Sequence, residues 1–367
     1  MALKRIGSKC FLIFGLSLIL SMFTSAFSGT NKVDAQSLKV SSSFNEFFDL
    51  KETFELSQEK VLIGSVRVLK IDDEGNIWIL DSRKIEIKKY SKSGHFLAAM
   101  GEKSPGPGGF ERPWDFFIFK DKIYVTDPIS RRIHVFDRQN RKFKYFIKVR
   151  DGRMIHVRNE DNIILSGQLL SLYGKEPVRK EEWLCLHISN RKGKSTKSFF
   201  PLNEFAKRNL VCDSIFFCVD EEDNIFGVQE TEYKIHKFTS DGQLARVFPI
   251  QNHAHYTPPP KEPFNRKFLR SQAEAWMNSW SHIIGIAVYK DYLFVTLSNP
   301  SDKPYEFYYD AYTRNGKFVK GGLGADYRLL YIDKEGMFYF LKETETNDGE
   351  ITFSILKYAL SWKQKRQ

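Results

Sequence analysis

The chain has 367 residues, 42% of them hydrophobic and 15% aromatic, which suffices for two or three average domains or for one large all-β domain with a substantial core. It carries 56 Lys and Arg residues against 45 Asp and Glu residues, a formal net charge of +11. Three of its four cysteines follow the N-terminal segment, and this odd number does not fit a small scaffold held by disulfides.

Residues 1–28 have the pattern of a secretory signal peptide. Three basic residues at positions 4, 5 and 9 precede an uncharged apolar run over Phe11–Phe23, and small residues follow near Ala26. An uncleaved membrane anchor is the alternative, although the run is shorter than the ~20 residues that a span needs. We therefore expect a protein exported to the periplasm or the cell exterior, with a linker over residues 29–50 and a charge of +8 after loss of the three basic residues.

Two kinds of turn signal recur along the rest of the chain, both rich in Asp, Asn and Gly, which tolerate left-handed backbone angles. The first kind lies at Asp73–Asn76, Lys120–Lys122, Asn159–Asn162, Glu222–Asn224, Lys290–Tyr292 and Asp333–Gly336. The second kind lies at Lys92–Gly94, Arg138–Asn140, Arg191–Gly193, Ser240–Gly242 and Arg314–Gly316. In three units the two turns are 19 residues apart, as for Gly75 and Gly94. This constant spacing predicts strands of fixed length between the turns.

Apolar strands fill these intervals. The first set includes Ile77–Leu80, Ile123–Thr126 and Ile225–Val228, and a second set follows each of them, as at Ile133–Phe136. Short antiparallel strands repeated in six units predict an all-β fold, a six-bladed β-propeller of four-stranded blades over residues 51–362 with a basic tail at 363–367. The last unit lacks its fourth strand, and Thr53–Leu56 is a spare strand. We expect this N-terminal strand to complete the last blade and close the ring.

The second unit carries a family resemblance. It begins Gly106-Pro107-Gly108-Gly109-Phe110-Glu111-Arg112-Pro113-Trp114, continues with Lys122–Asp127, and has Arg132–Asp137 as its third strand. This order resembles the NHL repeat, with its Gly-x-Phe-x-x-Pro beginning and its Arg-Ile-x-Val-Phe-Asp strand. The first unit resembles it through Asn76–Asp81, the fourth less closely, and the others by turn placement alone. The resemblance implies a six-bladed propeller over roughly residues 60–362.

The long, variable connections are expected on one face, the top face, where the first strand of each blade begins. One is Gly167–Glu182. Another is the insertion at 251–281, expected to be partly helical because Phe264, Phe268, Leu269, Trp276, Met277 and Trp280 recur at helical spacing. This helix would either form a partial lid over the central channel or pack on the tops of blades four and five.

Residues near the top ends of the inner strands are the candidate ligand-binding residues. Together with the adjoining loops they form a mixed polar and aromatic set: Arg83, Trp114, Asp115, Arg131, Arg132, Asp213, Glu230, Trp280, His282, Tyr327 and Arg328. Asp81 and Asp127, which end their strands, are expected instead to cap the following turns. The basic stretch from Arg131 to Arg158 is either a docking face for an anionic polymer or membrane surface, or a solvated outer strand.

No catalytic constellation is found. The peptide-amidating lyases resemble NHL propellers that hold zinc with histidines, and here His156, His282, His253 and His255 would be the candidates. Gluconolactonase-like propellers hold calcium with Glu and Asn, but here Asp115, Asp213 and Glu230 lack Asn partners.

We therefore expect a monomeric module that binds a protein or an anionic glycan through its top face, with no nucleic acid and no required cofactor, and with a membrane surface as a further candidate partner. A lyase or lactonase-like hydrolase, with zinc or calcium in the channel, is the first alternative. A structural component of an envelope complex is the second. Cys212 and Cys218 are expected to share one strand and to be buried without bonding to each other.

Overall fold

The computed structural model describes residues 42–150, 152–167, 183–209, 212–248, 256–262, 264, 269–300, 306–346 and 349–361. The expected signal peptide, the basic tail, Phe268, His253, His255 and most of the 167–182 connection lie outside the described residues. Among the helices that are described, none combines the length and the hydrophobicity needed to span a membrane.

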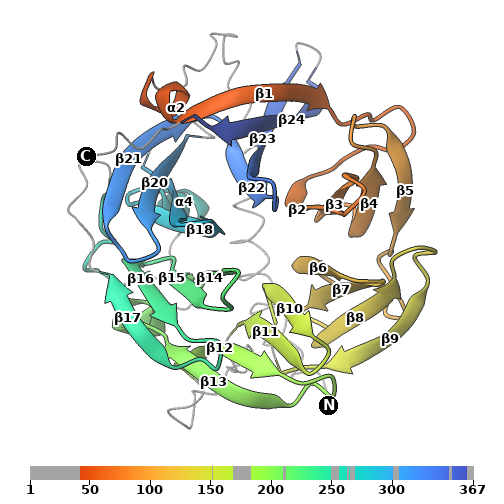
Figure 1. The fold of residues 1–367 in the computed structure, drawn as a ribbon, viewed down its shortest axis with the longest axis horizontal. Coiled ribbons are helices and arrows are strands. Elements are labelled where there is room, and N and C mark those ends of the chain that lie inside the picture. The colour runs from red at the N-terminus through yellow and green to blue at the C-terminus, as the bar shows by residue number, and fades with distance from the viewer. Residues whose placement is uncertain are drawn as a thin grey trace, which may run out of the picture.

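Six four-stranded antiparallel sheets form a ring around a central axis (Figure 1), which confirms the predicted six-bladed propeller. Blades 1 and 2 consist of β2 (Val66–Ile71), β3 (Ile77–Asp81), β4 (Glu86–Tyr90) and β5 (Phe96–Met100), then β6 (Asp115–Phe119), β7 (Lys122–Asp127), β8 (Arg132–Asp137) and β9 (Phe143–Lys148). Blades 3 and 4 consist of β10 (Ile155–Asn159), β11 (Asn162–Ser166), β12 (Leu184–Ser189) and β13 (Ser195–Pro201), then β14 (Ile215–Val219), β15 (Ile225–Gln229), β16 (Glu232–Phe238) and β17 (Leu244–Phe248).

Blade 5 consists of β18 (His282–Tyr289), β19 (Tyr292–Ser298), β20 (Phe307–Thr313) and β21 (Phe318–Ala325). Blade 6 consists of β22 (Arg328–Ile332), β23 (Met337–Glu345), β24 (Ile351–Leu360) and β1 (Phe48–Glu55). The first strand of each blade lies nearest the axis (Figure 1). The described helices are short: α2 (Ser42–Phe47) precedes β1, α3 (Glu204–Arg208) connects blades 3 and 4, and α4 (Arg270–Met277) connects blades 4 and 5.

In blades 1, 4 and 6 the turn between the first and second strands forms because one aspartate accepts hydrogen bonds from two backbone amides of the turn. Asp72 Oδ1 accepts from the amides of Glu74 and Asn76 at 3.1 and 2.8 Å, and Asp220 and Asp333 do the same in blades 4 and 6. Gly75 completes the first of these turns with a φ of 78°, which a side chain would strain. All these turns lie on the bottom face, opposite the face where the inner strands begin.

The hydrophobic core is divided among the junctions between blades. Trp78 and Ile87 of blade 1, for example, are buried in one cluster with Phe116 and Val125 of blade 2. Each propeller blade therefore buries both of its faces against neighbours, and this is why the strands contain so few exposed apolar side chains.

The N-terminal strand closes the ring as predicted. β1 pairs with β24, with Phe54 opposite Ile355, so the first and last strands of the chain lie side by side in blade 6. Part of the expected linker over residues 29–50 belongs to the propeller, because α2 and the start of β1 supply Phe44, Phe47 and Phe48 to the core.

The expectation that Cys212 and Cys218 share a strand is wrong. Cys218 lies in β14, whereas Cys212 precedes that strand and approaches Met277 of α4, with 3.8 Å between the sulfur atoms. All three described cysteines are free thiols. Burial raises the pKa of the Cys212 and Cys218 thiols, which disfavours the reactive thiolate form of both.

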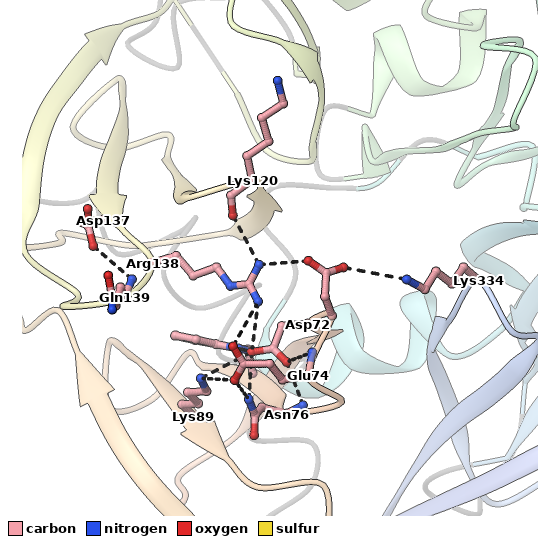
Figure 2. Close-up of polar contacts among 11 residues, drawn as sticks. Asp72, Glu74, Asn76, Lys89, Lys120, Asp137, Arg138, Gln139 and Lys334 are labelled. Carbon is pink, nitrogen blue, oxygen red and sulfur yellow. Dashed lines mark hydrogen bonds and ion pairs between the residues drawn. The ribbon is translucent and has the colours of Figure 1, made fainter.

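An arginine clamps neighbouring blades together on the bottom face. Figure 2 shows Arg138, from the β8–β9 turn of blade 2, reaching the β2–β3 turn of blade 1, where it lies 3.1 Å from Asp73 and 3.9 Å from Asp72. Arg314 of blade 5 makes the same kind of contact with Asp220 of blade 4 at 3.2 Å. Burial alone would raise the pKa of Asp72, but hydrogen bonds from Trp78 and Asn76 and the charge of Lys89 lower it.

Removing one clamp is expected to loosen one junction only. Arg138→Ala should lower the free energy of unfolding by about 1 kcal/mol, because the lost ion pairs are partly exposed to solvent. The loss should shrink in 1 M salt, where the Debye length falls to about 3 Å. Urea unfolding at low and high salt measures both values. Arg141→Ala, a nearby arginine without an ion pair to a described residue, is the control.

Candidate functional site

Four arginines from four different blades converge at the top end of the axis. Arg67 and Arg328 lie in β2 and β22, and Arg112 and Arg153 lie just before β6 and β10. We call these four residues the axial arginine cluster. Each lies within three residues of the start of an inner strand, and the ring arrangement brings these starts together around one axis (Figure 1).

An indole ring links members of the axial arginine cluster. The guanidinium carbon of Arg67 lies 4.4 Å from the centre of the Trp114 ring, and that of Arg153 lies 5.5 Å from it. Arg153 also makes a bidentate ion pair with Asp213 of blade 4, at 2.6 and 3.1 Å. On the other side, Arg328 donates a hydrogen bond to the carbonyl oxygen of Val66, next to Arg67. The contacts thus run continuously from blade 4 through blades 3, 2 and 1 to blade 6.

The arginine charges repel one another. Burial, together with the positive charges of Arg112 and Arg328, lowers the pKa of Arg67 to about 10, and Asp115 opposes this shift. Burial and Arg153 likewise lower the pKa of Arg112. Arg67 still keeps its charge at neutral pH, so the repulsion is not relieved by loss of a proton. Among the described residues, no carboxylate lies within ion-pair distance of Arg67 or Arg112, and Arg67 Nε is a buried donor without an acceptor.

Two acidic side chains near the cluster are already engaged. Asp115 is buried, and its two oxygens accept from the amides of Phe116 and Ile155 at 2.8 and 3.0 Å. Burial raises the pKa of Asp115, although Lys70 and Arg67 favour the ionised form. Burial also raises the pKa of Glu343, which Arg328 and Arg83 counteract. The four guanidinium groups outnumber the carboxylates of Asp115, Asp213 and Glu343 that lie near them, so the cluster keeps an excess of positive charge.

Buried aspartates at the ends of the second strands hold the cluster in place. Asp127 accepts from the amides of Glu111 and Arg112 at 2.7 and 3.2 Å, and therefore fixes the backbone that carries Arg112. Asp81 accepts from the amides of Gly64 and Ser65 at 2.8 and 3.1 Å, just before β2. Both also bond to the loop that follows their own strand, as predicted for turn caps.

Four of the predicted site residues lie at the axial arginine cluster: Trp114, Asp115, Asp213 and Arg328. Arg83 is exposed and near Glu343. Arg131 lies on the β7–β8 loop and Arg132 is the first residue of β8, and the guanidinium carbon of Arg132 lies 4.6 Å from the ring centre of Phe146 in the outer strand β9. Tyr327 is buried beside Phe44 in the core of blade 6.

Glu230, Trp280 and His282 form a separate buried group beneath α4. The Nδ1 atom of His282 lies 2.9 Å from Glu230 and its Nε2 atom lies 2.7 Å from the carbonyl oxygen of Met277, the last residue of α4. The Trp280 ring packs on the imidazole with 3.6 Å between centroids. These three side chains are at most 6% exposed, so they anchor the insertion rather than face a ligand.

The helix in the predicted insertion packs on neighbouring structure. Trp276 stacks parallel to Phe205 of α3 at 6.2 Å, and Met277 contacts Cys212. Of the two arrangements expected for this helix, the described contacts show the packing one. Residues 251–255, 263 and 265–268 of the same insertion lie outside the described residues.

Within the described parts of the chain, no group of three or more His, Cys, Asp or Glu side chains is arranged to hold a metal ion. His253 and His255 lie outside the described residues, and the two described histidines proposed as zinc donors are engaged elsewhere. Both ring nitrogens of His282 have partners, and the ring of His156 packs on Phe117 at 4.7 Å. Burial, with Arg158 and Lys70, lowers the pKa of His156 to about 3. The described candidates His156 and His282 therefore do not form a metal centre together.

The basic stretch from Arg131 to Arg158 does not form one surface. Arg153 lies at the top, whereas Arg138, Lys144 and Arg158 lie at the bottom and pair with acidic turns. Arg67, Arg112 and Arg153 were not among the predicted site residues. All three lie within three residues of the start of an inner strand, whereas the prediction named only the residues nearest to each start.

Comparisons with known proteins agree with the fold. A family profile described as "6-bladed beta-propeller" (DUF5128) matches residues 25–250. No curated protein matches the chain in sequence. A putative exported protein from Bacteroides fragilis is 14% identical with a TM-score of 0.61, covering 90% of this chain and 98% of that one. A member of the DUF4221 family from Bacteroides vulgatus is 11% identical with a TM-score of 0.59, covering 86% and 98%. Identities this low show a shared fold only, whereas the profile covers more than half of the chain: the protein belongs to the DUF5128 family of six-bladed β-propellers.

Proposed function

We propose that this protein is an exported binding module that recognises an anionic saccharide at the axial arginine cluster. The observation that supports this most is the pair Arg67 and Arg112, which lack a carboxylate partner among the described residues although each lies beside further positive charge. An anion placed between them would relieve the repulsion and accept from guanidinium groups, whose planar fork matches carboxylate and sulfate oxygens.

The chemistry around the arginines favours a saccharide over a bare anion. Trp114 is half-buried next to two guanidinium groups, and the part of its indole that stays exposed is an apolar surface to which the carbon face of a sugar ring binds. The ligand would therefore carry a carboxylate or sulfate group next to a ring. The N-terminal pattern of residues 1–28 and the resemblance to the NHL repeat support an exported propeller of this kind, and both remain predictions.

Titration calorimetry with oligogalacturonate and with a sulfated heparin oligosaccharide tests the proposal. The double variant Arg67→Ala/Arg112→Ala should bind at least tenfold more weakly than the wild type, because each lost charge-assisted hydrogen bond is worth about 1.5–3 kcal/mol before compensation. Wild-type affinity should fall as salt is raised from 50 to 500 mM. The matched control is Arg131→Ala/Arg132→Ala, which removes the same charge from the same face away from the axis.

Two results would contradict the proposal. The first result is that Arg131→Ala/Arg132→Ala loses binding of the anionic probes, while Arg67→Ala/Arg112→Ala keeps it. That result would place the anion site near Arg131 and Arg132, away from the axis. The second result is that neither probe binds, while a protein partner binds equally well to the wild type and to Arg67→Ala/Arg112→Ala. That result would assign the top face to protein recognition instead.

A further inference from the structure

A second candidate site lies on the opposite face of the molecule. A pocket of about 550 Å³ opens between blades 3 and 4, lined by the bottom end of β10, the start of β11, part of β13 and both bottom turns of blade 4. This volume is within the range of small-molecule sites. All the lining residues belong to the described parts of the chain, and none belongs to the axial arginine cluster.

The pocket exists because this junction lacks the arginine clamp. The clamp arginines Arg138 and Arg314 are the second residues of the turns between the third and fourth strands of blades 2 and 5. In blade 4 the equivalent position is occupied by Ser240. In blades 2 and 5 the arginine extends to the first turn of the preceding blade. The serine side chain is too short to do so, and the space that an arginine would fill stays open.

A different arginine holds the two blades together. Arg158 of β10 donates to the carbonyl oxygens of Ser240, at 2.6 Å, and Asp223, and its Nε lies 2.9 Å from the Asp223 carboxylate. These contacts join blade 3 to both bottom turns of blade 4 along one wall of the pocket. The junction is therefore kept at a fixed width without the pocket being filled.

The lining is polar and balanced in charge. Arg158 and Lys197 contribute positive charge, and Asp223 and Asp241 contribute negative charge. His156 adds a neutral imidazole, since burial lowers its pKa to about 3. Such a lining favours a neutral ligand, in contrast to the axial arginine cluster on the other face.

Hydrogen-bonding capacity remains in the pocket. Asn162 lines it, and the buried Oδ1 atom of this side chain accepts no hydrogen bond from any described residue. Thr196 uses its hydroxyl hydrogen on the carbonyl oxygen of Ile188 at 3.0 Å and keeps its oxygen lone pairs for another donor. A buried polar atom without a partner costs about 1–3 kcal/mol, which a ligand hydroxyl would recover.

We propose that this pocket, between blades 3 and 4 at Asn162, Thr196 and Ser240, binds a neutral mono- or disaccharide. Sugar hydroxyls are both donors and acceptors, so one ligand satisfies the free acceptors of Asn162 and Thr196 and the exposed donors of Lys197 and Ser240. The absence of excess charge disfavours phosphates, sulfates and uronates at this site. This proposal does not depend on the function proposed for the axial arginine cluster.

The test is titration of the whole protein with galactose, N-acetylglucosamine, maltose and cellobiose, followed by saturation-transfer NMR. The wild type should bind at least one of them. Ser240→Arg restores the clamp side chain and fills the pocket, so it should weaken that binding tenfold or more. Asn162→Ala should also weaken sugar binding about tenfold. If Ser240→Arg does not fold, Asn162→Ala alone tests whether the sugar binds in this pocket. The axial double variant Arg67→Ala/Arg112→Ala should bind neutral sugars within twofold of the wild type.

Either of two results would overturn the proposal. The first is that none of the four sugars binds the wild-type protein. The second is that a sugar binds equally well to wild type and to folded Ser240→Arg and Asn162→Ala. Because the anionic probes act at the other face, failure here would leave the function proposed for the axial arginine cluster unaffected.

Discussion

Phe44→Ala is expected to lower the free energy of unfolding by about 3–5 kcal/mol, the cost of removing a buried aromatic ring. Phe44 is fully buried, and its ring lies 4.7 Å from that of Phe48, 5.4 Å from Tyr358 and 5.5 Å from Phe340. The side chain therefore links α2 to β1, β24 and β23 of blade 6. Its loss would weaken the one junction in which the two ends of the described chain meet.

Urea unfolding followed by tryptophan fluorescence measures this effect, and Leu50→Ala is the matched control. Leu50 lies in β1 as well, but its side chain is 48% exposed, so the expected change is about 1 kcal/mol or less. Equal small losses in the two variants would show that α2 adds nothing to ring closure beyond the pairing of β1 with β24.

Lys88→Ala should be about as damaging, again by about 3–5 kcal/mol, because it leaves a buried carboxylate without its cation. Lys88 and Asp81 are both fully buried, with 2.5 Å between Lys88 Nζ and Asp81 Oδ2. The same ammonium group lies 2.9 Å from Glu86 and donates to the carbonyl oxygen of Leu62 at 2.9 Å. Asp81 in turn holds the backbone that leads to Arg67, so a folded Lys88 variant should also bind the anionic probes more weakly.

Two further variants separate charge from packing. Lys88→Met keeps the aliphatic stem and should still be destabilised by several kcal/mol if the charge matters. Lys89→Ala changes the next residue of β4, whose ammonium is partly exposed and lies 3.4 Å from Asp72, and should cost about 1 kcal/mol. A Lys88→Met protein as stable as the wild type would mean that the four backbone amides bound to Asp81 satisfy this carboxylate by themselves.

The scaffold could be predicted from sequence because its determinants are local. Asp72 and Gly75 specify a turn within a few residues, and the spacing of such turns fixes the strand lengths between them. Even blades 5 and 6, which match the NHL pattern only by their turns, form the same four-stranded sheets. The closing strand could be inferred as well, since the last unit was one strand short.

The candidate site could be predicted only in part, because its determinants are not local. Trp114 and Arg328 were found from their places at strand starts, but the convergence with Arg67 depends on three blades meeting at one axis. His282 was placed on the same surface by the same count, yet the packing of Trp280 buries it. Periodicity indicated that a helix exists in the insertion but did not indicate where that helix would pack.

The pairing of β1 with β24 also affects biosynthesis. Glu52 and Lys357, which form an ion pair across these strands, are 305 residues apart, so the first blade strand to leave the ribosome is the last to find its partner. At translation rates of roughly 5–20 residues per second, β1 waits on the order of 15–60 s for β24. During that interval a strand carrying Phe48 and Phe54 is unpaired. The order of synthesis thus opposes the order of closure, and a chaperone that covers residues 42–55 would raise the yield of folded protein.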